Sequence, residues 1–280
     1  MKIITLIDNN TFNPELETEH GLSVYIETDK HKILFDTGKS EIFIRNAEKL
    51  NVNLRDVDTV VISHGHYDHI GGLISFLNLN KTAKVFLNKE IFDYQYYSIR
   101  GGIQSQSGWS EELMKYENRF VLIKDELLIE DELIFISNIK KKYQTPKGNQ
   151  MLFKSKGDEM EQDDFQHELI FCLDTPSGLS VFGGCAHNGI TNILHTVNTH
   201  FPEKKINLIF GGMHLIDENL FSETESASEL MEIGHEINRL AEDALIFTGH
   251  CTCENAKDEI RKVLGSGLQS FSTGHEIEIP

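Results

Sequence analysis

Residues 59–73 read TVVISHGHYDHIGGL, and this stretch decides both the fold and the chemistry expected of the chain. Its first four residues are apolar or β-branched, which predicts a buried strand. Four side chains that bind metals then fall within six positions: His64, His66, Asp68 and His69. Histidines two positions apart point the same way from an extended chain, whereas an adjacent aspartate and histidine need a second metal or another direction. A strand that leads straight into these residues indicates a metal site.

Other apolar runs end in a similar manner. Three of them lead through glycine into Cys185-Ala186-His187, Met213-His214 and Gly249-His250, and Leu34-Phe35 leads into Asp36-Thr37-Gly38. Because ligands collect at the carboxyl ends of strands, we expect these side chains at one rim of a sheet. His187 and His250 are predicted metal ligands. The resulting six nitrogen and oxygen donors suit two divalent transition-metal ions bridged by a water.

The remaining candidates would support or flank the metal pair. Asp68 and His214 are the candidate catalytic residues. A site with six ligands has no vacancy for His214, so a substrate contact is favoured, with packing in the core as the alternative. His20 is a candidate substrate contact, and Asp36 is expected to orient a ligand histidine. Neutral imidazole and carboxylate favour zinc, iron or manganese over calcium, and zinc is expected first.

Composition restricts the partners. The 280 residues are 39% hydrophobic, and 26 basic against 44 acidic side chains give a formal net charge of −18. This balance argues against nucleic acids and anionic membranes as partners. No run of 18 apolar residues occurs, so no membrane span is expected. Four cysteines are no disulfide framework, and the apolar start reads as a strand and not as a signal peptide, so a cytoplasmic protein is expected.

The periodicity of apolar residues predicts a mixed α/β protein with layered sheets, in one domain over residues 1–280. The predicted strands are Ile3–Ile7, Ser23–Glu27, Lys32–Phe35, Thr59–Ile62, Lys84–Leu87, Phe120–Ile123, Leu133–Ile136, Leu169–Leu173, Leu179–Phe182, Asn207–Phe210 and Ala244–Phe247. The predicted helices are 188–201, 223–241 and 254–264. The second has Ser222 and Glu225 placed for a capping box, and Gly265 closes the third.

Segment 88–110 has two interpretations. Phe92, Tyr96 and Ile99 share a helical face, which predicts packing in the core. Alternatively, the segment is a mobile lid whose aromatic side chains, Trp109 among them, stack on a flat ring such as a pterin.

Residues 63–73 resemble the H-x-H-x-D-H signature of the metallo-β-lactamase superfamily, and LFDTG at 34–38 resembles a strand end of the same superfamily. Four further stretches resemble a narrower group, the 7,8-dihydropterin-6-methyl-4-(β-D-ribofuranosyl)aminobenzene-5'-phosphate synthase-like proteins. They read EHGLS at 19–23, GCAHNGI at 184–190, GGMHL at 211–215 and TGHCT at 248–252. The resemblance covers nearly the whole chain. It implies an α/β fold of four layers, an αββα sandwich of two mixed sheets with flanking helices.

The resemblance also implies how the ligands divide between the metals. One ion would be held by His64, His66 and His187, and the other by Asp68, His69 and His250. The superfamily's third histidine usually precedes a hairpin, which makes His167 a rival of His187. Cys185 stands where the superfamily usually has a bridging aspartate. It would either bind metal as a thiolate or pack as a small apolar residue.

The function expected is metal-dependent hydrolysis of a small phosphorylated or diphosphate-bearing substrate, pterin-related in type, by metal-bound hydroxide. The first alternative is a synthase whose metals bind a diphosphate leaving group during transfer of a dihydropterin-methyl group to an aminobenzene. The second is a non-catalytic member that binds metal or a pterin-like ligand. A diiron redox protein is disfavoured, because such members of the superfamily carry a glutamate where this chain has His66.

Overall fold

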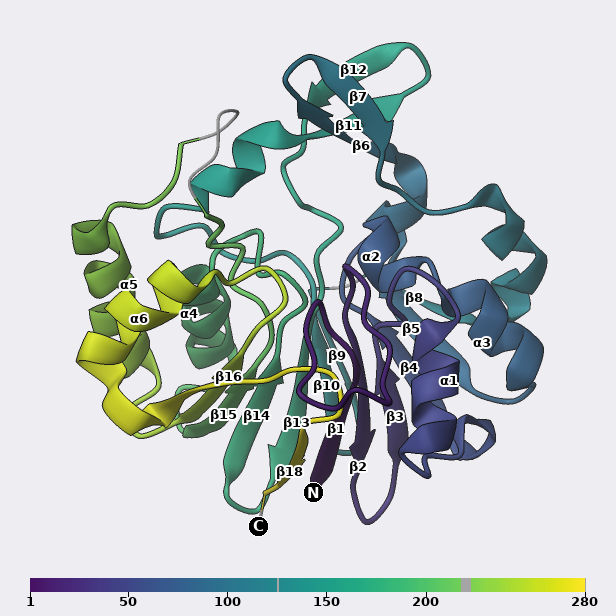
Figure 1. Cartoon of the computed structure of the whole chain (residues 1–280), viewed down its shortest axis with the longest axis horizontal. Helices are drawn as coiled ribbons and strands as arrows, with labels where there is room; N and C mark the ends of the chain where they lie inside the picture. Colours follow the sequence, from purple (N-terminus) through teal and green to yellow (C-terminus); the bar gives the residue numbers. More distant parts are fainter. Residues whose placement is uncertain (125, 218–222, 280) are drawn as a thin grey trace.

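Two seven-stranded sheets packed face to face form the centre of the protein, which a computed structural model describes over residues 1–124, 126–217 and 223–279 (Figure 1). The first sheet has the order β18-β1-β2-β3-β4-β5-β8, from β1 (Lys2–Ile7), β2 (Ser23–Glu27), β3 (Lys32–Phe35), β4 (Thr59–Ile62), β5 (Lys84–Asn88), β8 (Phe120–Ile123) and β18 (Glu276–Glu278). The second has the order β17-β16-β15-β14-β13-β10-β9, from β9 (Leu127–Glu130), β10 (Leu133–Ile136), β13 (Ile170–Thr175), β14 (Gly178–Phe182), β15 (Ile206–Phe210), β16 (Leu245–Thr248) and β17 (Leu268–Ser270). Each sheet combines parallel and antiparallel pairs, so both are mixed.

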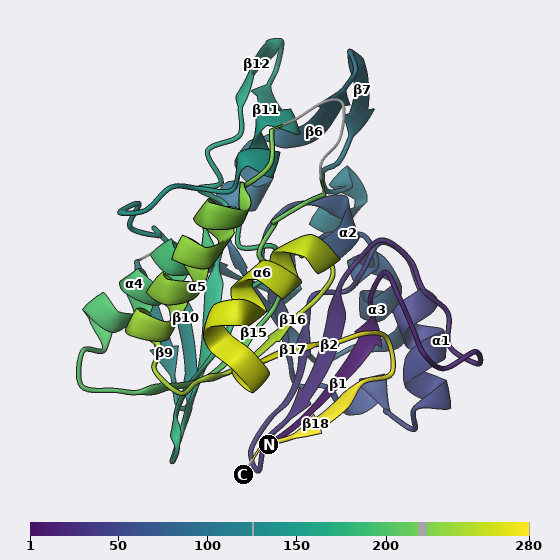
Figure 2. The same cartoon turned by 60° about the vertical axis from the view of Figure 1, so that its left-hand side comes forward.

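Helices cover the outer faces of both sheets (Figure 2). On the first sheet lie α1 (Ile42–Lys49) and α3 (Leu73–Leu79), and on the second lie α4 (Ile190–His200), α5 (Ala227–Leu240) and α6 (Glu254–Leu264). The four-residue helix α2 (Tyr67–Ile70) follows β4 directly. Short 3₁₀ helices complete the chain: η1 (Leu54–Asp56), η2 (Lys89–Asp93), η3 (Glu111–Arg119), η4 (Lys147–Met151) and η5 (Gly265–Gly267).

Alternation along each strand explains why the layers form. Val60 and Ile62 of β4 pack against the helices, whereas Val61 between them packs against the other sheet. The inter-sheet layer is rich in phenylalanine, and Phe86 of β5 stacks on Phe135 of β10 with ring centroids 4.5 Å apart. The predicted αββα sandwich is confirmed, because one apolar layer lies between the two sheets and helices pack on the outer face of each.

A third sheet of four strands stands apart from the sandwich and was not predicted (Figure 2). Its order is β12-β11-β6-β7, from β6 (Gln95–Arg100), β7 (Ile103–Gln106), β11 (Leu152–Lys156) and β12 (Glu159–Gln162). The helical face proposed for Phe92, Tyr96 and Ile99 is therefore wrong. Gly101 and Gly102 both have positive φ and join β6 to β7 by a two-residue hairpin turn, a geometry that ends any helical pattern there.

The helices agree with the prediction except at one start. Helix α5 begins at Ala227, and its capping box is formed by Ser226 and Glu229, one turn later than predicted. Glu225 instead accepts a hydrogen bond from the backbone N–H of Lys147, and Ser222 lies outside the described residues. None of the helices in the described ranges has the length and apolar character needed to cross a bilayer.

Candidate metal centre

A cavity of about 1190 Å³ opens where the carboxyl ends of β4, β14, β15 and β16 meet. Its floor contains the predicted metal-binding and catalytic side chains, among them His66, Asp68, His187, His214 and His250. The third sheet borders the same cavity through residues of β6 and β7. The predicted convergence of strand ends is therefore present in the fold.

Two glycines let the strand ends approach closely enough to form this floor. A Cβ atom on Gly184 would lie 2.1 Å from the hydroxyl oxygen of Ser63, just before His64. A Cβ atom on Gly211, whose φ is +146°, would lie 1.8 Å from the carbonyl oxygen of Gly183. Both contacts are shorter than any side chain tolerates, so glycine is required for the ends of β4, β14 and β15 to come together.

In both His64 and His187, Nδ1 makes a hydrogen bond and Nε2 makes none among the described residues. Ser63 Oγ donates its hydrogen to Asp36, so it accepts the Nδ1–H of His64 at 2.9 Å. The amide oxygen of Asn149 accepts the Nδ1–H of His187 at 3.0 Å. Both Nε2 atoms are buried and have no hydrogen-bond partner among the described residues. Burial and the neighbouring imidazoles hold the pKa of both rings well below the usual value, which keeps them in the neutral form that binds metals.

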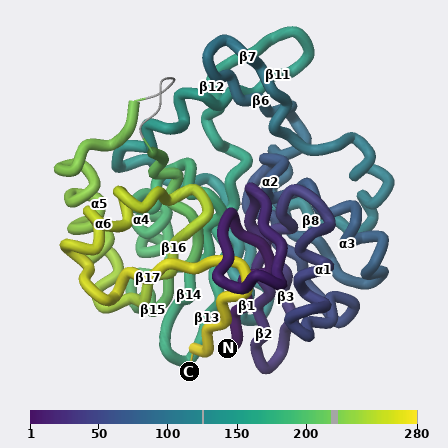
Figure 3. Tube along the Cα trace, viewed as in Figure 1, coloured from purple at the N-terminus to yellow at the C-terminus, as the bar shows by residue number. Residues whose placement is uncertain are grey.

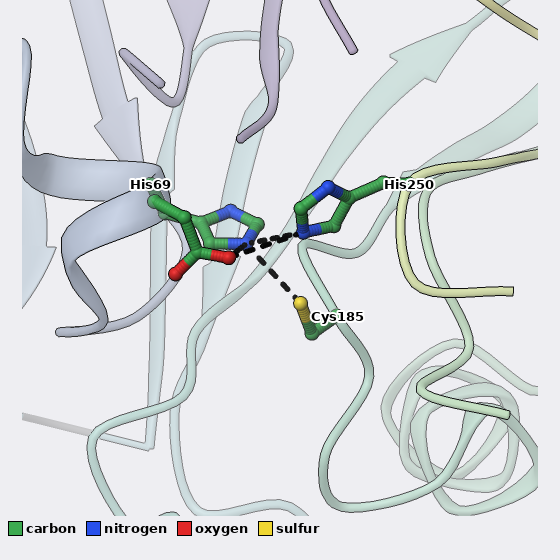
Figure 4. Close-up of side chains that lie close together, drawn as sticks. His69, Cys185 and His250 are labelled. Carbon is green, nitrogen blue, oxygen red and sulfur yellow. Dashed lines mark hydrogen bonds and ion pairs between the residues drawn. The ribbon is translucent and has the colours of Figure 1, made fainter. Parts of the chain in front are cut away.

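His69 and His250 form a second pair, in which Nδ1 of each ring again makes a hydrogen bond to an oxygen acceptor. Asp36 Oδ2 accepts from His69 Nδ1 at 2.7 Å, which gives Asp36 the orienting role predicted for it. Asn9 Oδ1 accepts from His250 Nδ1 at 3.2 Å. The two Nε2 atoms then face each other at 3.2 Å (Figure 4). Two lone pairs so close repel unless a cation or a proton lies beside them, which fits a metal site.

Asp68 completes this second group. Its Oδ2 lies 3.4 Å from His250 Nε2 and 3.7 Å from His69 Nε2. Burial raises the pKa of Asp68, but His69 and His250 outweigh it and hold that pKa well below its usual range. In return, burial lowers the pKa of His250, while Asp68 and its neighbours raise it to about 9. The buried carboxylate thus favours a positive charge next to it, on His250 or on a metal ion.

His20 lies next to this group, at the mouth of the cavity. Its Nε2 is 3.2 Å from Asp68 Oδ2, and its ring stacks on that of His250 with centroids 5.1 Å apart. About half of the side chain, 52%, is exposed. His20 therefore lies half-exposed beside two candidate ligands and stays a candidate substrate contact.

His66 and His167 differ from the other histidines. His66 Nε2 lies 3.5 Å from Asp163 Oδ2 without a hydrogen-bond partner among the described residues, and ligand atoms of His66, Asp163 and His167 lie within 4.8 Å of one another. His167 is saturated, because its Nδ1 accepts from the backbone N–H of Gly65 and its Nε2 donates to Asp163. The geometry therefore favours His187 over His167 as the third candidate ligand beside His64 and His66.

His214 and Cys185 both lie on the cavity floor. Neither ring nitrogen of His214 finds a hydrogen-bond partner in the described part of the chain, and its ring centroid is 4.2 Å from that of His187. Cys185 Sγ lies 3.1 Å from His69 Nε2 (Figure 4). Burial raises the pKa of the Cys185 thiol well above its usual value. His214 thus has the free nitrogens that a substrate contact needs.

Trp109 does not reach this site, so the prediction of a substrate contact there is corrected. Its side chain is buried in the core beside the first sheet and packs edge-to-face on Phe92. Its indole N–H donates to the carbonyl of Tyr94. A tryptophan whose ring and N–H are both engaged in this way stabilises the base of the third sheet and does not stack on a ligand.

Several residues that hydrogen-bond to the candidate ligands were missed. Asn149 lies in the 3₁₀ helix η4 and Asp163 in the loop after β12, and no sequence pattern identifies either of them. Asp8 accepts the backbone N–H of His250 at 2.9 Å and follows the first apolar strand directly. The rule that selected Asp36 at a strand end would have selected Asp8 as well.

A sandwich of two mixed sheets between helices, with a histidine-rich floor at one rim, defines the metallo-β-lactamase fold class. A family model described as the metallo-beta-lactamase superfamily matches residues 17–143. A solved structure, Tm1679, described as a metal-dependent hydrolase of the beta-lactamase superfamily, is 31% identical with a TM-score of 0.83, covering 100% of this chain and 99% of that one. This chain belongs to the metallo-β-lactamase superfamily.

Two further relatives differ in how closely they resemble the chain. The 7,8-dihydropterin-6-methyl-4-(beta-D-ribofuranosyl)-aminobenzene-5'-phosphate synthase of Methanocaldococcus jannaschii is 27% identical over 99% of this chain and 96% of its own. A diphosphatase from the PhnP family is only 13% identical, with a TM-score of 0.53 over 100% of this chain and 98% of that one. The first is similar along its whole length, whereas the second shares the fold alone.

Proposed function

We propose that this protein is a metal-dependent hydrolase with two metal ions that acts on a small phosphorylated or diphosphate-bearing substrate. One observation carries the proposal: His64, His69, His187 and His250 each direct Nδ1 to an acceptor and Nε2 to a common buried floor. Acceptors of this kind fix the tautomer of histidines that bind metals. Buried polar atoms are normally hydrogen-bonded, so several unpartnered ring nitrogens beside a carboxylate indicate a site for a cation.

The ligands divide into two groups in this proposal. One ion would be held by His64, His66 and His187, and the other by Asp68, His69 and His250. Zinc is expected first, because imidazole and carboxylate suit it and it has no strong preference of geometry. Two divalent ions held there would make hydroxide available near neutral pH and neutralise charge on a phosphate oxygen.

The remaining side chains of the floor would bind and orient the substrate. His20 and His214 lie on either side of the metal groups, beside Asp68 and beside His187. His214 has both ring nitrogens available to hold a phosphate oxygen or to give a proton to a leaving group. Asp68, buried and ionised, would accept a hydrogen bond from the attacking water as well as bind metal.

Cationic side chains along the cavity support an anionic substrate. Lys39, Arg100 and Lys257 all line it, although the chain as a whole carries a net charge of −18. The volume of about 1190 Å³ exceeds that of many sites for small molecules, so a ring system with a phosphate group fits. Asp8, Asp68, Asp217 and Glu254 also line the cavity, and Lys257 pairs with Glu254, so attraction of an anionic substrate depends on Lys39 and Arg100 together with the two proposed metal ions.

Replacing Arg100 with alanine is expected to raise KM for a phosphorylated substrate by about 10-fold with a smaller change in kcat, since a charge-assisted hydrogen bond contributes on that scale. Arg100 is exposed on β6 and lines the cavity. Steady-state kinetics would measure the change. Arg261→Ala is the matched control, because Arg261 pairs with Asp258 on α6 and does not line the cavity. An equal rise in KM in both variants would contradict a specific role for Arg100.

A second candidate, a synthase, is favoured by the similarity along the whole chain to the named synthase. In that reaction the metals would neutralise a diphosphate leaving group while a dihydropterin-methyl group is transferred to an aminobenzene. The same floor and the same cations would serve both reactions. The two candidates differ in the acceptor, which is water for the hydrolase and an aromatic amine for the synthase.

One experiment tests the proposal and separates it from the synthase. Zinc-loaded and manganese-loaded protein would be assayed for bound metal, and then with bis(p-nitrophenyl) phosphate and with a dihydropterin-methyl diphosphate, with and without an aminobenzene acceptor. Two metals per chain and hydrolysis without an acceptor support the hydrolase. Diphosphate release that requires the acceptor supports the synthase instead. Two bound metals with no product in any reaction would mean a binding protein, and no bound metal would refute the proposal.

A further inference from the structure

Cys185 lies where the two groups of metal-binding side chains meet. Its Sγ is within 4.8 Å of ligand atoms of Asp68, His69 and His250, and also within 4.8 Å of ligand atoms of His64 and His187. The sulfur lies 3.1 Å from His69 Nε2 (Figure 4). Among the described residues, no other side chain belongs to both of these groups.

The backbone holds the sulfur in this place. Cys185 follows β14 directly, and Gly184 before it has no room for a side chain against Ser63. The carbonyl of Gly184 accepts the backbone N–H of Gly212, and Ala186 after it has a left-handed φ of 53°. Only 3% of Cys185 is exposed, so the side chain has no alternative direction toward solvent.

Cys172 shows what a cysteine that only packs looks like in this protein. It lies in β13, is fully buried, and belongs to the apolar cluster beside α4. Burial raises the pKa of its thiol, and no polar side chain shifts that pKa further. Cys185 is equally buried, but its sulfur faces histidine nitrogens and carboxylates instead of methyl groups.

We propose that Cys185 is a metal ligand whose thiolate sulfur is shared by both ions. The inference rests on the proposed function, because it needs the two ions of that site. On binding, the S–H bond breaks, the proton leaves to solvent, and the sulfur lone pairs form the metal–sulfur bonds. A thiolate is a softer donor than a carboxylate, so this centre favours zinc or iron over manganese and magnesium.

Cobalt substitution tests the inference on the whole protein, because a thiolate bound to cobalt(II) gives a sulfur-to-metal charge-transfer band in the near ultraviolet. We expect this band in the cobalt-loaded protein. It should vanish in Cys185→Ser and in Cys185→Asp while persisting in Cys172→Ala. The aspartate variant should still bind two ions, since a carboxylate also bridges metals. Cys251→Ser is the closest control, because Cys251 Sγ is within 4.8 Å of Cys185 Sγ, and it too should keep the band.

Zinc X-ray absorption on the unmodified protein gives the same test without a variant. One sulfur neighbour at about 2.3 Å from each zinc is expected. Two bound ions without a sulfur neighbour, or a cobalt band that persists in Cys185→Ser, would overturn the shared thiolate and leave the proposed function standing. A protein that binds no cobalt or zinc would overturn the proposed function as well.

Discussion

Replacing Asp68 with asparagine is expected to lower kcat/KM by more than about 100-fold, since even residues that only orient a ligand cost 10–100-fold when substituted. The amide keeps the shape of the side chain but removes the charge that Asp68 places 3.4 Å from His250. The second ion loses its only carboxylate in the proposed set, and the substrate loses a hydrogen-bond acceptor. Kinetics and metal counting on the same sample would measure both effects.

The matched control for this change is Asp258→Asn. Asp258 is an exposed aspartate on α6 that pairs with Arg261, so its loss should leave both turnover and metal content unaltered. Full activity in the Asp68 variant would show that the second group of side chains takes no part in the reaction. Lost activity with two ions still bound would assign Asp68 a role in catalysis alone.

Removal of metal is expected to lower the melting temperature as well as abolish turnover. Free zinc at 1,000 times Kd stabilises the folded state by about 4.1 kcal/mol for one site. For a chain of 280 residues this corresponds to about 7 °C in Tm, and more if both sites are filled. Thermal unfolding with and without a chelator measures the shift.

Two histidine variants make this measurement specific. His250→Ala removes a ligand of the second group, so the shift on adding zinc should shrink. His235 is exposed on α5, away from the cavity, and His235→Ala should keep the full shift. Identical melting temperatures of the unmodified protein in zinc and in chelator would speak against any metal bound in the folded state.

The parts of the site that the sequence predicts are those that local order determines. When an apolar strand leads into a histidine, that side chain lies at the rim of the sheet regardless of the rest of the fold. Short patterns therefore placed His64, His187 and His250 at the rim. The αββα layers follow in the same way from strands without a polar face. Asp36 belongs to this class too, because it follows β3 directly.

Contacts between distant segments explain what the sequence did not show. Asn149, in η4, orients His187 across 38 positions, and Asp163, in the loop after β12, lies 97 positions from His66; neither position shows periodicity. The third sheet was missed because β6 alternates only weakly, with Tyr96 alone fully buried. Trp109 looked like part of a lid because its neighbours are polar, but its own ring packs on Phe92.

The two termini of the chain lie side by side because β18 pairs with β1 (Figure 3). At the other end of β1, Asp8 accepts the backbone N–H of His250, and the backbone N–H of Asp8 donates to the hydroxyl of Thr273. His69 and His250 are 181 positions apart, which a ribosome covers in roughly 10–35 s. During that interval the nascent chain contains His69 but not yet His250, so this group of candidate ligands is incomplete. In the proposed function, both ions can therefore be captured only after His250 has been synthesised and has folded against His69.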